Sequence, residues 1–502
     1  MTALELSSAV AVVGTGTMGQ GIAQVALVAG HPVRLYDAAP GRAKAAADAI
    51  GVRLDRLVEK GRLSAGDRAT AAARLAPAES LAELAGCALV IEAVLEQLEV
   101  KQRLFQDLED VVAEDCLLAT NTSSLSVTAI AGALKKPGRF LGLHFFNPAP
   151  LLPLVEVVSG FATDEAAATR AYETARAWGK TPVRCADTPG FIVNRVARPF
   201  YAEALRLYEE RVADPATIDA VLRECGGFKM GPFELTDLIG QDVNEAVTRS
   251  VWESFFQDPK FTPSLAQRRL VESRRLGRKS GQGWYAYDDT PRAEPHTAGH
   301  ERAPESVTVH GDLFAADALL DLMREAGIRV GHGKDAPSCP GSIELPGGAR
   351  LEPADGTSPD AAAEPTIHFD LALDYRTATR IALAPSGRVD ERALKEAVGL
   401  FQALGKKVSV IGPAPGMIVA RTVWMLVDFA LDAVGREVAD AQDVDTAMRL
   451  GVNYPLGPIE WGRRLTAYRV AEALDLMNDE YPTGRYAPSQ ALRRQAVREE
   501  YS

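Results

Sequence analysis

The chain has 502 residues, of which 47% are hydrophobic and 24% charged, a composition typical of a globular protein with roughly three or four domains. Its formal net charge of −12 argues against general nucleic-acid binding, which needs a basic face. The five cysteines are scattered and form no C-x-x-C pair, which argues against a disulfide framework and against a zinc site. We expect no signal peptide and no membrane span, and therefore a cytoplasmic protein. We also expect no metal site.

The stretch VAVVGTGTMGQG, Val10–Gly21, combines a buried-strand pattern with a glycine-rich turn. Its glycines have the G-x-G-x-x-G spacing of a dinucleotide-binding turn. In such a turn the first glycine allows the bend, the second lets backbone approach a pyrophosphate, and the third lets the helix pack on the strand. The N-terminus of the following helix offers free N–H groups to the phosphates. The cofactor contacts predicted in this turn are Gly14, Gly16, Thr17, Met18 and Gly19.

A second predicted strand, His31–Asp37, ends in a carboxylate eighteen residues after Gly19. A carboxylate at this position binds ribose hydroxyls and repels a 2′-phosphate, so the sequence favours NAD over NADP. Arg34 and Arg42 lie near Asp37 and leave NADP open as an alternative. A strand–turn–helix that binds no nucleotide is the other alternative.

Strand-like and helix-like segments alternate from about residue 5 to residue 188, which is typical of an α/β domain. The strands expected after Asp37 are 89–94, 117–121, 139–146 and 151–159. The expected helices are 41–60, continued to about residue 75, then 97–112 and 164–179. We therefore predict a Rossmann-type NAD-binding domain at residues 1–188.

The composition changes beyond Thr188, where a long helical pattern predicts an all-α domain at residues 189–287. Residues 288–306 are polar, contain prolines and lack periodicity, which predicts a linker. Residues 307–412 contain strand-like pieces but no glycine-rich turn, which predicts a reduced Rossmann-like α/β domain. Residues 413–502 are again helical and predict a second all-α domain.

The last section of the chain repeats an earlier one at a fixed offset of 226 residues. PGFIVNR, which starts at Pro189, matches PGMIVAR, which starts at Pro415, and MGPFE matches LGPIE at the same offset. A register without gaps over this length implies a duplicated helical domain. Asn194 of the first copy is Ala420 in the second, so the second copy has lost a polar group.

His144 is the strongest candidate for a catalytic base among the seven histidines. Oxidation of an alcohol by a nicotinamide cofactor needs a base for the hydroxyl proton, and histidine suits this role near neutral pH. His144 lies in GLHFFNP, and Glu156 follows twelve residues later in the next predicted strand. If the two strands are neighbours, Glu156 could fix the tautomer of the imidazole and stabilise the imidazolium. A packed histidine at a strand end, with an exposed strand glutamate, is the structural alternative.

NTSSL, Asn121–Leu125, places polar groups at a strand end, where ligands bind in such sheets. Ser123 could bind a substrate hydroxyl, although Ser123 or Ser124 could equally cap a helix. Asn194 could face the cleft or be a polar surface residue. Its loss in the second copy favours a functional role.

The chain resembles the L-3-hydroxyacyl-CoA dehydrogenases over residues from about 8 to 287, in family order. The motifs that carry this resemblance are VAVVGTGTMGQGIA, IEAVLE, NTSSL, GLHFFNPAPLLPLVEVV, DTPGFIVNR, MGPFEL and GRKSGQGWY. The duplicated tail and the middle region without motifs are similar to the long bacterial members, including those of the phenylacetate pathway.

The resemblance implies His144 as the catalytic base, Glu156 as its partner, and Ser123 and Asn194 as the residues that position a thioester. The NAD contacts that it implies, besides the glycine-rich turn, are Asp37, Glu96, Lys101, Ser123, Asn147 and Lys279. Lys60 matches more loosely as a contact of a CoA phosphate. Since the second copy lacks NTSSL, HFFNP and the asparagine, the resemblance implies one active site per chain.

The implied reaction is the NAD-dependent oxidation of (S)-3-hydroxyacyl-CoA, of the 3-hydroxybutyryl or 3-hydroxyadipyl type, in fatty-acid or phenylacetate catabolism. The substrate is expected between the first two domains. Arg195 and Arg198 are the candidates for a cation that would meet a terminal carboxylate. The alternatives are a dehydrogenase of a free hydroxy acid, such as a sugar acid, and an NAD-binding scaffold without catalysis. In shorter relatives the helical domain forms the dimer interface, so we expect a homodimer or a pseudo-dimer within one chain.

Overall fold

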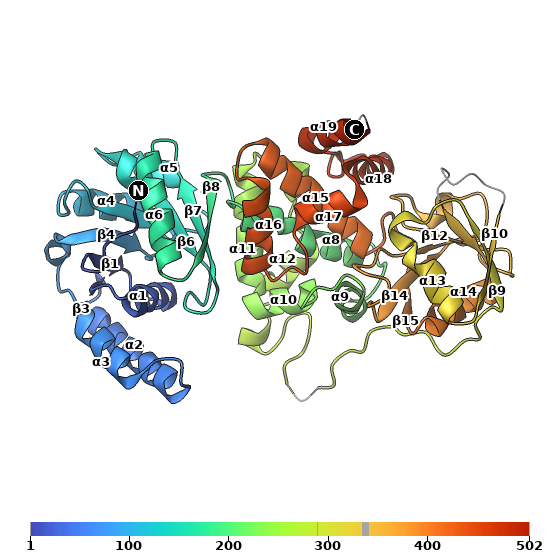
Figure 1. The fold of residues 1–502 in the computed structure, drawn as a ribbon, viewed down its shortest axis with the longest axis horizontal. Helices are drawn as coiled ribbons and strands as arrows, with labels where there is room; N and C mark the ends of the chain where they lie inside the picture. The colour runs from blue at the N-terminus through green and yellow to red at the C-terminus, as the bar shows by residue number, and fades with distance from the viewer. Residues whose placement is uncertain (1, 289, 334–340, 501–502) are drawn as a thin grey trace. The chain divides into compact units, whose positions relative to one another are not determined.

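The computed structural model describes residues 2–288, 290–333 and 341–500, and the chain forms two compact units (Figure 1). The first unit comprises Met1–Arg195 and Arg436–Val452, and the second comprises Val196–Gly435 and Asn453–Ser502. Each unit contains its own β-sheet. The chain therefore enters the first unit twice, the second time with a short segment from the C-terminal half.

The first unit is built on an eight-stranded sheet in the order β3-β2-β1-β4-β5-β6-β7-β8. Strands β1 to β6 are parallel, as expected when helices cross between them, whereas β7 runs antiparallel to β6. The strands are nearly all buried, so their apolar runs are continuous instead of alternating. Their bounds are β1 (Ala9–Val13), β2 (Val33–Tyr36), β3 (Leu75–Pro77), β4 (Cys87–Glu92), β5 (Leu117–Thr120), β6 (Phe140–Phe145), β7 (Leu154–Ser159) and β8 (Thr181–Ala186).

Helices cover this sheet and bury their apolar faces against it. Their bounds are α1 (Thr17–Ala29), α2 (Arg42–Glu59), α3 (Ala65–Arg74), α4 (Leu98–Glu109), α5 (Val127–Ala131), α6 (Glu165–Ala177), α7 (Val193–Val196) at the unit boundary, and α16 (Ala441–Gly451). The expected continuous helix from 41 to about 75 is wrong. Gly61, with φ of 67°, ends the first helix, and Ser64 caps α3 by accepting a hydrogen bond from Asp67 N. The two helices form a hairpin that projects from the sheet (Figure 1).

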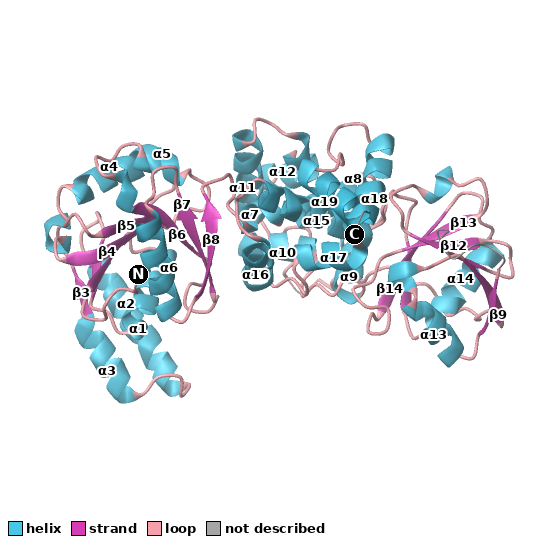
Figure 2. Ribbon diagram, turned by 45° about the horizontal axis from the view of Figure 1, so that its top comes forward, coloured by secondary structure: helices cyan, strands magenta, loops and turns pink. Residues whose placement is uncertain are grey.

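The second unit contains a mixed seven-stranded sheet in the order β10-β9-β11-β12-β13-β14-β15 (Figure 2). The sheet lacks the glycine-rich turn, as expected for a reduced Rossmann-like fold. Its strands are β9 (Ser306–His310), β10 (Arg329–His332), β11 (Ser342–Glu344), β12 (Arg350–Pro353), β13 (Thr366–Phe369), β14 (Arg380–Pro385) and β15 (Lys407–Val410). Its helices are α8 (Arg198–Glu209), α9 (Pro215–Glu224), α10 (Pro232–Ile239), α11 (Gln241–Ser254), α12 (Leu265–Glu272), α13 (Ala318–Glu325), α14 (Glu391–Ala403), α15 (Val419–Gly435), α17 (Pro458–Leu465), α18 (Ala467–Glu480) and α19 (Gln490–Glu500).

The repeat seen in the sequence extends through the structure at the same offset. Adding 226 to the bounds of β7, α6, α10 and α11 gives the bounds of β14, α14, α17 and α18. The antiparallel pair followed by a parallel strand, β6-β7-β8, likewise recurs as β13-β14-β15. The duplication therefore begins in the sheets and is not confined to the helical domains.

The two copies exchange one helix. Helix α9 of the first copy packs against β14 of the second sheet, and its counterpart α16 packs against β7 and β8 of the first sheet. A backbone hydrogen bond stabilises each of these contacts. Thr379 N donates to Glu224 O, at the end of α9, at 3.1 Å, and Ala186 N donates to Val438 O, just before α16, at 2.8 Å. Each sheet is thus completed by a helix from the other copy.

An ion-pair cluster also joins the copies inside the second unit. Glu203 of α8 is fully buried and accepts hydrogen bonds from Arg421 Nε at 2.7 Å and Arg485 Nη2 at 2.5 Å. The hydroxyl of Tyr486 donates to the same carboxylate at 2.8 Å. Although burial opposes ionisation, the two guanidinium groups lower the pKa of Glu203 to about 2. The carboxylate is therefore charged at neutral pH and holds α8 against α15.

The described cysteines are buried free thiols: Cys87, Cys116, Cys185 and Cys225. Cys339 lies outside the described residues. Among the helices that the structure describes, none combines the length and apolarity needed to cross a membrane.

Candidate active site

The glycine-rich turn joins β1 to α1 and has a different requirement at each glycine. Gly14 has a φ of 92°, in the left-handed region that favours glycine. A Cβ at Gly19 would lie 1.8 Å from the carbonyl oxygen of Gly14, so only glycine allows α1 to pack this closely. A Cβ at Gly16 would meet nothing within 4 Å, which leaves this backbone open to a ligand.

The N-terminus of α1 is uncapped by side chains, with Gly16 as its N-cap. Its first N–H groups and positive dipole end are therefore available to an anion. Thr17 and Met18 form the first turn of this helix. The turn fits the pyrophosphate of a dinucleotide, as the sequence predicts.

Asp37 lies just beyond β2 and contacts the glycine-rich turn. Its Oδ2 accepts hydrogen bonds from Thr15 N at 2.9 Å and Thr15 Oγ1 at 2.7 Å, and its Oδ1 accepts from Ala39 N at 3.0 Å. Partial burial opposes ionisation, but these hydrogen bonds lower the pKa of Asp37. A charged carboxylate thus stands beside the turn, where it can bind ribose hydroxyls and repel a 2′-phosphate.

Glu96 and Lys101 belong to a polar cluster after β4. The ammonium of Lys101 is buried and pairs with Glu92 at 2.5 Å and Glu96 at 3.1 Å. Glu96 also accepts hydrogen bonds from Thr122 Oγ1 at 2.6 Å and Ser123 N at 3.0 Å. Burial opposes its ionisation, but Lys101 and Thr122 lower the pKa of Glu96. Glu96 therefore fixes the backbone of the NTSSL loop, and Lys101 fixes Glu96.

Glu92 belongs to the same cluster, although its role was not predicted from the sequence. Its Oε2 accepts a hydrogen bond from Thr120 Oγ1 at 2.7 Å, which joins the ends of β4 and β5. Its second oxygen accepts from Val94 N at 2.7 Å. The sequence feature that could have indicated this role is the position of Glu92 at the end of a predicted core strand, inside the motif IEAVLE.

His144 and Glu156 face each other on the antiparallel strands β6 and β7. The imidazole Nδ1 lies 2.6 Å from Glu156 Oε2. Because a carboxylate only accepts, Nδ1 carries the proton, and Nε2 is left free to accept one. Glu156 is fully buried, so the alternative of an exposed strand glutamate is wrong.

The other oxygen of Glu156 holds the start of α7. Its Oε1 accepts hydrogen bonds from Ile192 N at 3.1 Å and Val193 N at 2.9 Å. The next residue, Asn194, directs its amide Nδ2 toward the carbonyl oxygen of Ser123 at 3.5 Å. The structure therefore brings His144, Glu156, Ser123 and Asn194 together in the first unit.

Ser123 is not a helix cap. Ser126 caps α5, because its hydroxyl accepts a hydrogen bond from Ala129 N at 3.0 Å, and the hydroxyl of Ser124 donates to Glu96 at 3.0 Å. The hydroxyl of Ser123 has no hydrogen-bond partner within the described part of the chain. Asn121 is a residue that the sequence did not single out: its Oδ1 accepts from Phe145 N at 2.8 Å and holds the loop beside the end of β6.

The remaining predicted contacts lie in different places. Asn147 is exposed in the loop after β6, and Lys60 is exposed at the end of α2. Lys279 lies in the second unit, on the short 3₁₀ helix η4 (Arg278–Ser280), where its ammonium pairs with Asp242 at 2.5 Å. The first two side chains are thus open to a ligand, whereas Lys279 is held by a carboxylate.

The second copy has replaced the His–Glu pair. The counterpart of Glu156 is Ala382, and in the β13–β14 register the residue opposite Ala382 is Asp370. The Asp370 carboxylate accepts hydrogen bonds from Ile418 N at 3.0 Å and Val419 N at 2.8 Å, the counterparts of the two N–H groups that Glu156 holds. Burial raises the pKa of Asp370 to about 6, despite these hydrogen bonds. The second copy thus keeps neither His144 nor Glu156, and the carboxylate that holds its helix comes from Asp370, at the position of His144.

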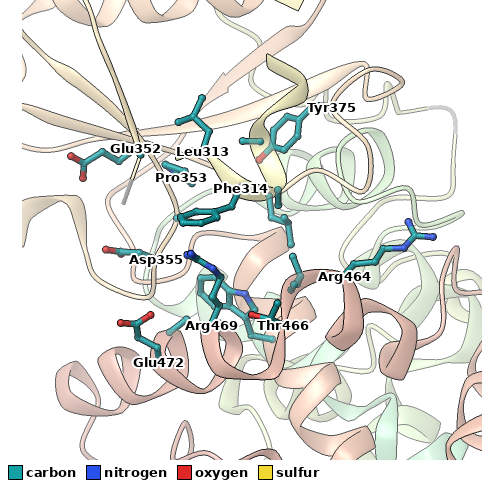
Figure 3. A pocket seen from close by; sticks show the side chains of 18 residues that line it. Leu313, Phe314, Glu352, Pro353, Asp355, Tyr375, Arg464, Thr466, Arg469 and Glu472 are labelled. Atoms are coloured by element: carbon teal, nitrogen blue, oxygen red, sulfur yellow. The ribbon is translucent and has the colours of Figure 1, made fainter. Parts of the chain in front are cut away.

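A cavity of about 480 Å³ lies in the second unit, between the second sheet and the α17–α18 corner (Figure 3). Phe314, Tyr375 and Trp424 provide aromatic surface, and the guanidinium of Arg469 lies 3.1 Å from the centre of the Phe314 ring. Neither Asp370 nor any histidine lines this cavity among the described residues. It therefore does not reproduce the acid–base pair of the first copy.

Three family models match the chain. The model described as the NAD binding domain of 3-hydroxyacyl-CoA dehydrogenase matches residues 9–188. The model of the C-terminal domain of the same family matches twice, at residues 190–287 and 416–501. The model of the reduced Rossmann-fold domain of 3-hydroxybutyryl-CoA dehydrogenase matches residues 351–415.

Individual relatives agree with these matches. A 3-hydroxyadipyl-CoA dehydrogenase of Escherichia coli is 44% identical over 98% of this chain and 98% of its own length. A 3-hydroxybutyryl-CoA dehydrogenase of Mycobacterium tuberculosis is 41% identical and covers 55% of this chain and 98% of its own. The crystal structure of a 3-hydroxybutyryl-CoA dehydrogenase from Escherichia coli superposes with a TM-score of 0.90 at 42% identity, covering 99% of this chain and 100% of that one.

Proposed function

The chain belongs to the 3-hydroxyacyl-CoA dehydrogenase family, and we propose that it oxidises (S)-3-hydroxyacyl-CoA thioesters to 3-oxoacyl-CoA thioesters with NAD through the His144–Glu156 pair. The observation that carries the proposal is the 2.6 Å contact between His144 Nδ1 and the buried Glu156 carboxylate. This pair lies on the same sheet as the glycine-rich turn. The parallel strands β1 and β6 direct their carboxyl ends to one edge, where ligands of such sheets bind.

In the proposed mechanism Nε2 of His144 accepts the proton of the substrate hydroxyl. The C3–H bond breaks with its electron pair, and the C3–O bond becomes a carbonyl. NAD, when bound, supplies the hydride acceptor at its nicotinamide. The imidazole becomes an imidazolium, which the Glu156 carboxylate stabilises through Nδ1.

Ser123 and Asn194 are proposed to orient the thioester. The free hydroxyl of Ser123 can bind a substrate oxygen, and the amide Nδ2 of Asn194 lies 3.5 Å from the backbone carbonyl oxygen of the same serine. The loss of this amide at Ala420, in the copy that has Asp370 at the position of His144, supports a role in the reaction. On the cofactor side we assign Glu96, Lys101, Asn147 and Lys279 to the NAD site, and Lys60 to a CoA phosphate.

The substrate type is proposed from the relatives. A 3-hydroxyadipyl-CoA or 3-hydroxybutyryl-CoA substrate would place the enzyme in phenylacetate or fatty-acid catabolism. The buried free thiols suit a reducing compartment, so we place it in the cytoplasm.

The helix exchange supports a pseudo-dimer within one chain over a requirement for a homodimer. Since each sheet already receives its helix from the other copy, no second chain is needed to supply it. Light scattering after size exclusion should therefore give one chain of 53.8 kDa, whereas a mass of twice that value would favour the homodimer.

The deciding experiment is the initial rate of NADH formation with a panel of 3-hydroxyacyl-CoA thioesters and with the same acids lacking CoA. Turnover on the thioesters that is lost in His144→Gln supports the proposal. Turnover on free hydroxy acids alone would instead support the sugar-acid type of dehydrogenase. NAD binding without any turnover would support a scaffold.

A further inference from the structure

The cavity of Figure 3 lies where parallel strands of the second sheet end. Strands β9, β12 and β13 point the same way, because β11 runs antiparallel to both β9 and β12, and β12 pairs in parallel with β13. The segments that follow their carboxyl ends line the cavity, at Leu313–Ala316, Ala354–Asp355 and Leu371. Ligands of α/β sheets bind at this edge. The cavity therefore has the position of a ligand site, although its sheet lacks the glycine-rich turn.

The cavity also has the size and the surface of a site for a planar organic ligand. Its volume of about 480 Å³ lies within the range of about 300–1,000 Å³ that is typical of ligand pockets. Three aromatic side chains line it, those of Phe314, Tyr375 and Trp424. Aromatic rings of this kind bind the flat faces of other rings by stacking.

The charged groups of the lining have both signs. The guanidinium carbon of Arg469 lies 3.1 Å from the centre of the Phe314 ring, and within the described residues no carboxylate pairs with this arginine (Figure 3). A guanidinium over a ring keeps its N–H edges available to a phosphate. The carboxylates of the lining are Glu352, Asp355 and Glu472. They can accept hydrogen bonds from hydroxyl or amino groups of a ligand.

The first copy shows that the helical scaffold does not require the cations of this cavity. At the offset of 226 residues, the counterparts of Arg464 and Arg469 are Leu238 and Val243. Both counterparts are exposed, so the corner between the two helices forms equally with apolar residues. The second copy has therefore gained two guanidinium groups on the wall of a cavity, which the loss of an active site does not explain.

Two residues of the lining have a backbone conformation that favours glycine. Phe314 has a φ of 52° and Thr466 a φ of 65°. The counterpart of Thr466 in the first copy is Gly240, with a φ of 106°. A β-branched residue in this region costs free energy, and such costs are concentrated at ligand sites. The strained positions of the second copy thus coincide with the wall of this cavity.

We propose that this cavity binds a purine ribonucleotide, and that the chemistry it recognises is the adenosine 5′-phosphate group. The aromatic rings would stack on the base, the carboxylates would accept hydrogen bonds from the ribose hydroxyls, and Arg469 would bind the phosphate. Simpler ligands fit the lining less well. Three carboxylates repel an anion that lacks hydroxyl groups, and a purely apolar ligand makes no use of Arg469. This site is separate from the proposed reaction and goes beyond it.

The loop between β9 and α13 restricts the ligand to a single nucleotide. By its place in the sheet order, this loop is the counterpart of the glycine-rich turn. In that turn a Cβ at Gly16 would meet nothing within 4 Å, whereas in the second copy the side chain of Phe314 lines the cavity. A ring therefore lies where a dinucleotide would bring its pyrophosphate, which excludes NAD. The adenosine 5′-phosphate group can come from a free mononucleotide or from the nucleotide end of CoA.

The test is calorimetric titration of the full chain with AMP in the presence of saturating NAD, which fills the dinucleotide site proposed for the first unit. We expect one AMP per chain. Arg469→Met removes the charge and keeps an unbranched side chain, so it should weaken AMP binding by about 10- to 100-fold. Phe314→Leu removes a stacking ring and should weaken it by about fivefold or more. Displacement of AMP by CoA would identify CoA as the source of the group, and no displacement would identify a free mononucleotide.

The matched control is Arg463→Met on α17, which removes an exposed guanidinium that does not line the cavity. Its affinity for AMP should equal that of the wild type. Because Arg469 is exposed as well, both arginine variants should keep the unfolding temperature of the wild type. The inference is overturned if the wild type does not bind AMP, if NAD displaces it, or if Arg469→Met binds it as tightly as Arg463→Met does.

Discussion

Glu156 holds the imidazole of His144 with one carboxylate oxygen and the backbone of Val193 with the other, at 2.6 and 2.9 Å. One buried side chain therefore fixes both the orientation of the proposed base and the start of α7, which carries Asn194. The carboxylate has two roles, one electrostatic and one structural, and different substitutions should separate them.

Glu156→Gln keeps a polar side chain of the same shape but removes the charge that stabilises the imidazolium. We expect kcat to fall by about 10²- to 10⁴-fold, with NAD affinity unchanged. Glu156→Ala should in addition lower the thermal unfolding temperature, because it leaves the N–H groups of Ile192 and Val193 without acceptors, at about 1–3 kcal/mol for each buried group. Steady-state kinetics, NAD titration and thermal unfolding of both variants check this. A Glu156→Gln enzyme with near-normal kcat would contradict the proposed role.

Substitution by alanine should have different effects at two glycines of the turn: a loss of NAD affinity at Gly16 and a loss of stability at Gly19. In Gly16→Ala the added methyl group meets no protein atom within 4 Å, so the fold should be unchanged, but the methyl group occupies the approach to the pyrophosphate. We expect a loss of NAD affinity of roughly tenfold or more at a normal unfolding temperature. In Gly19→Ala the methyl group would lie 1.8 Å from Gly14 O, so stability itself should fall. If Gly16→Ala unfolds earlier while Gly19→Ala does not, the assignment of the turn is wrong.

The carboxylate of Asp37 should determine the preference for NAD over NADP. Asp37→Ala removes the carboxylate that would repel a 2′-phosphate, and the nearby Arg42 then remains as a cation. We expect the ratio of kcat/KM for NAD to that for NADP to fall by about 10- to 100-fold, which is about 1.4–2.7 kcal/mol. Because Asp37 also accepts the hydrogen bonds of Thr15, Asp37→Asn serves as the control that removes the charge but keeps an acceptor. An unchanged ratio in both variants would exclude Asp37 from ribose binding.

The sequence predicted the parts of the fold that depend on local pattern. The strand–turn–helix around Gly14 and the paired strands of His144 and Glu156 follow from short motifs. The edge strand β8 was missed because Pro182 interrupts its apolar pattern, and proline is tolerated there because the strand lies at the sheet edge. Strand β3 has three residues, too few to show a period. The exchange of α9 and α16 could not be predicted, because the sheet against which a helix packs depends on contacts between residues far apart in the sequence.

The sequence predicted those site residues whose side chains take part in the proposed reaction, but not those that hold other residues in place. Glu92 and Asn121 were missed, although both lie in the motifs IEAVLE and NTSSL. Their contacts are with Thr120 and with Phe145 N, and sequence spacing does not show which distant backbone a side chain holds.

The buried cluster of Glu203 predicts how stability depends on pH. Its pKa of about 2 in the folded state lies below the ordinary value of 4.5, because Arg485 and Arg421 outweigh the effect of burial. A carboxylate with a lowered pKa contributes stability that is fully present above pH 4.5 and is lost as the pH falls toward 2. The second unit should therefore be destabilised by acid through this residue.

Glu203→Gln leaves Arg421 and Arg485 buried with less compensation, so we expect about 3–5 kcal/mol lower free energy of unfolding at pH 7. The difference from the wild type should shrink between pH 4.5 and pH 2, as protonation removes the same charge from Glu203. Denaturant unfolding of both proteins at pH 7, 5 and 3 measures it. Glu210→Gln is the matched control, since Glu210 pairs with the same Arg421 at 3.0 Å but is partly exposed, and it should cost about 1 kcal/mol or less. Equal costs at Glu203 and Glu210, or a difference that persists at pH 3, would show that the cluster does not join the two copies through its charge.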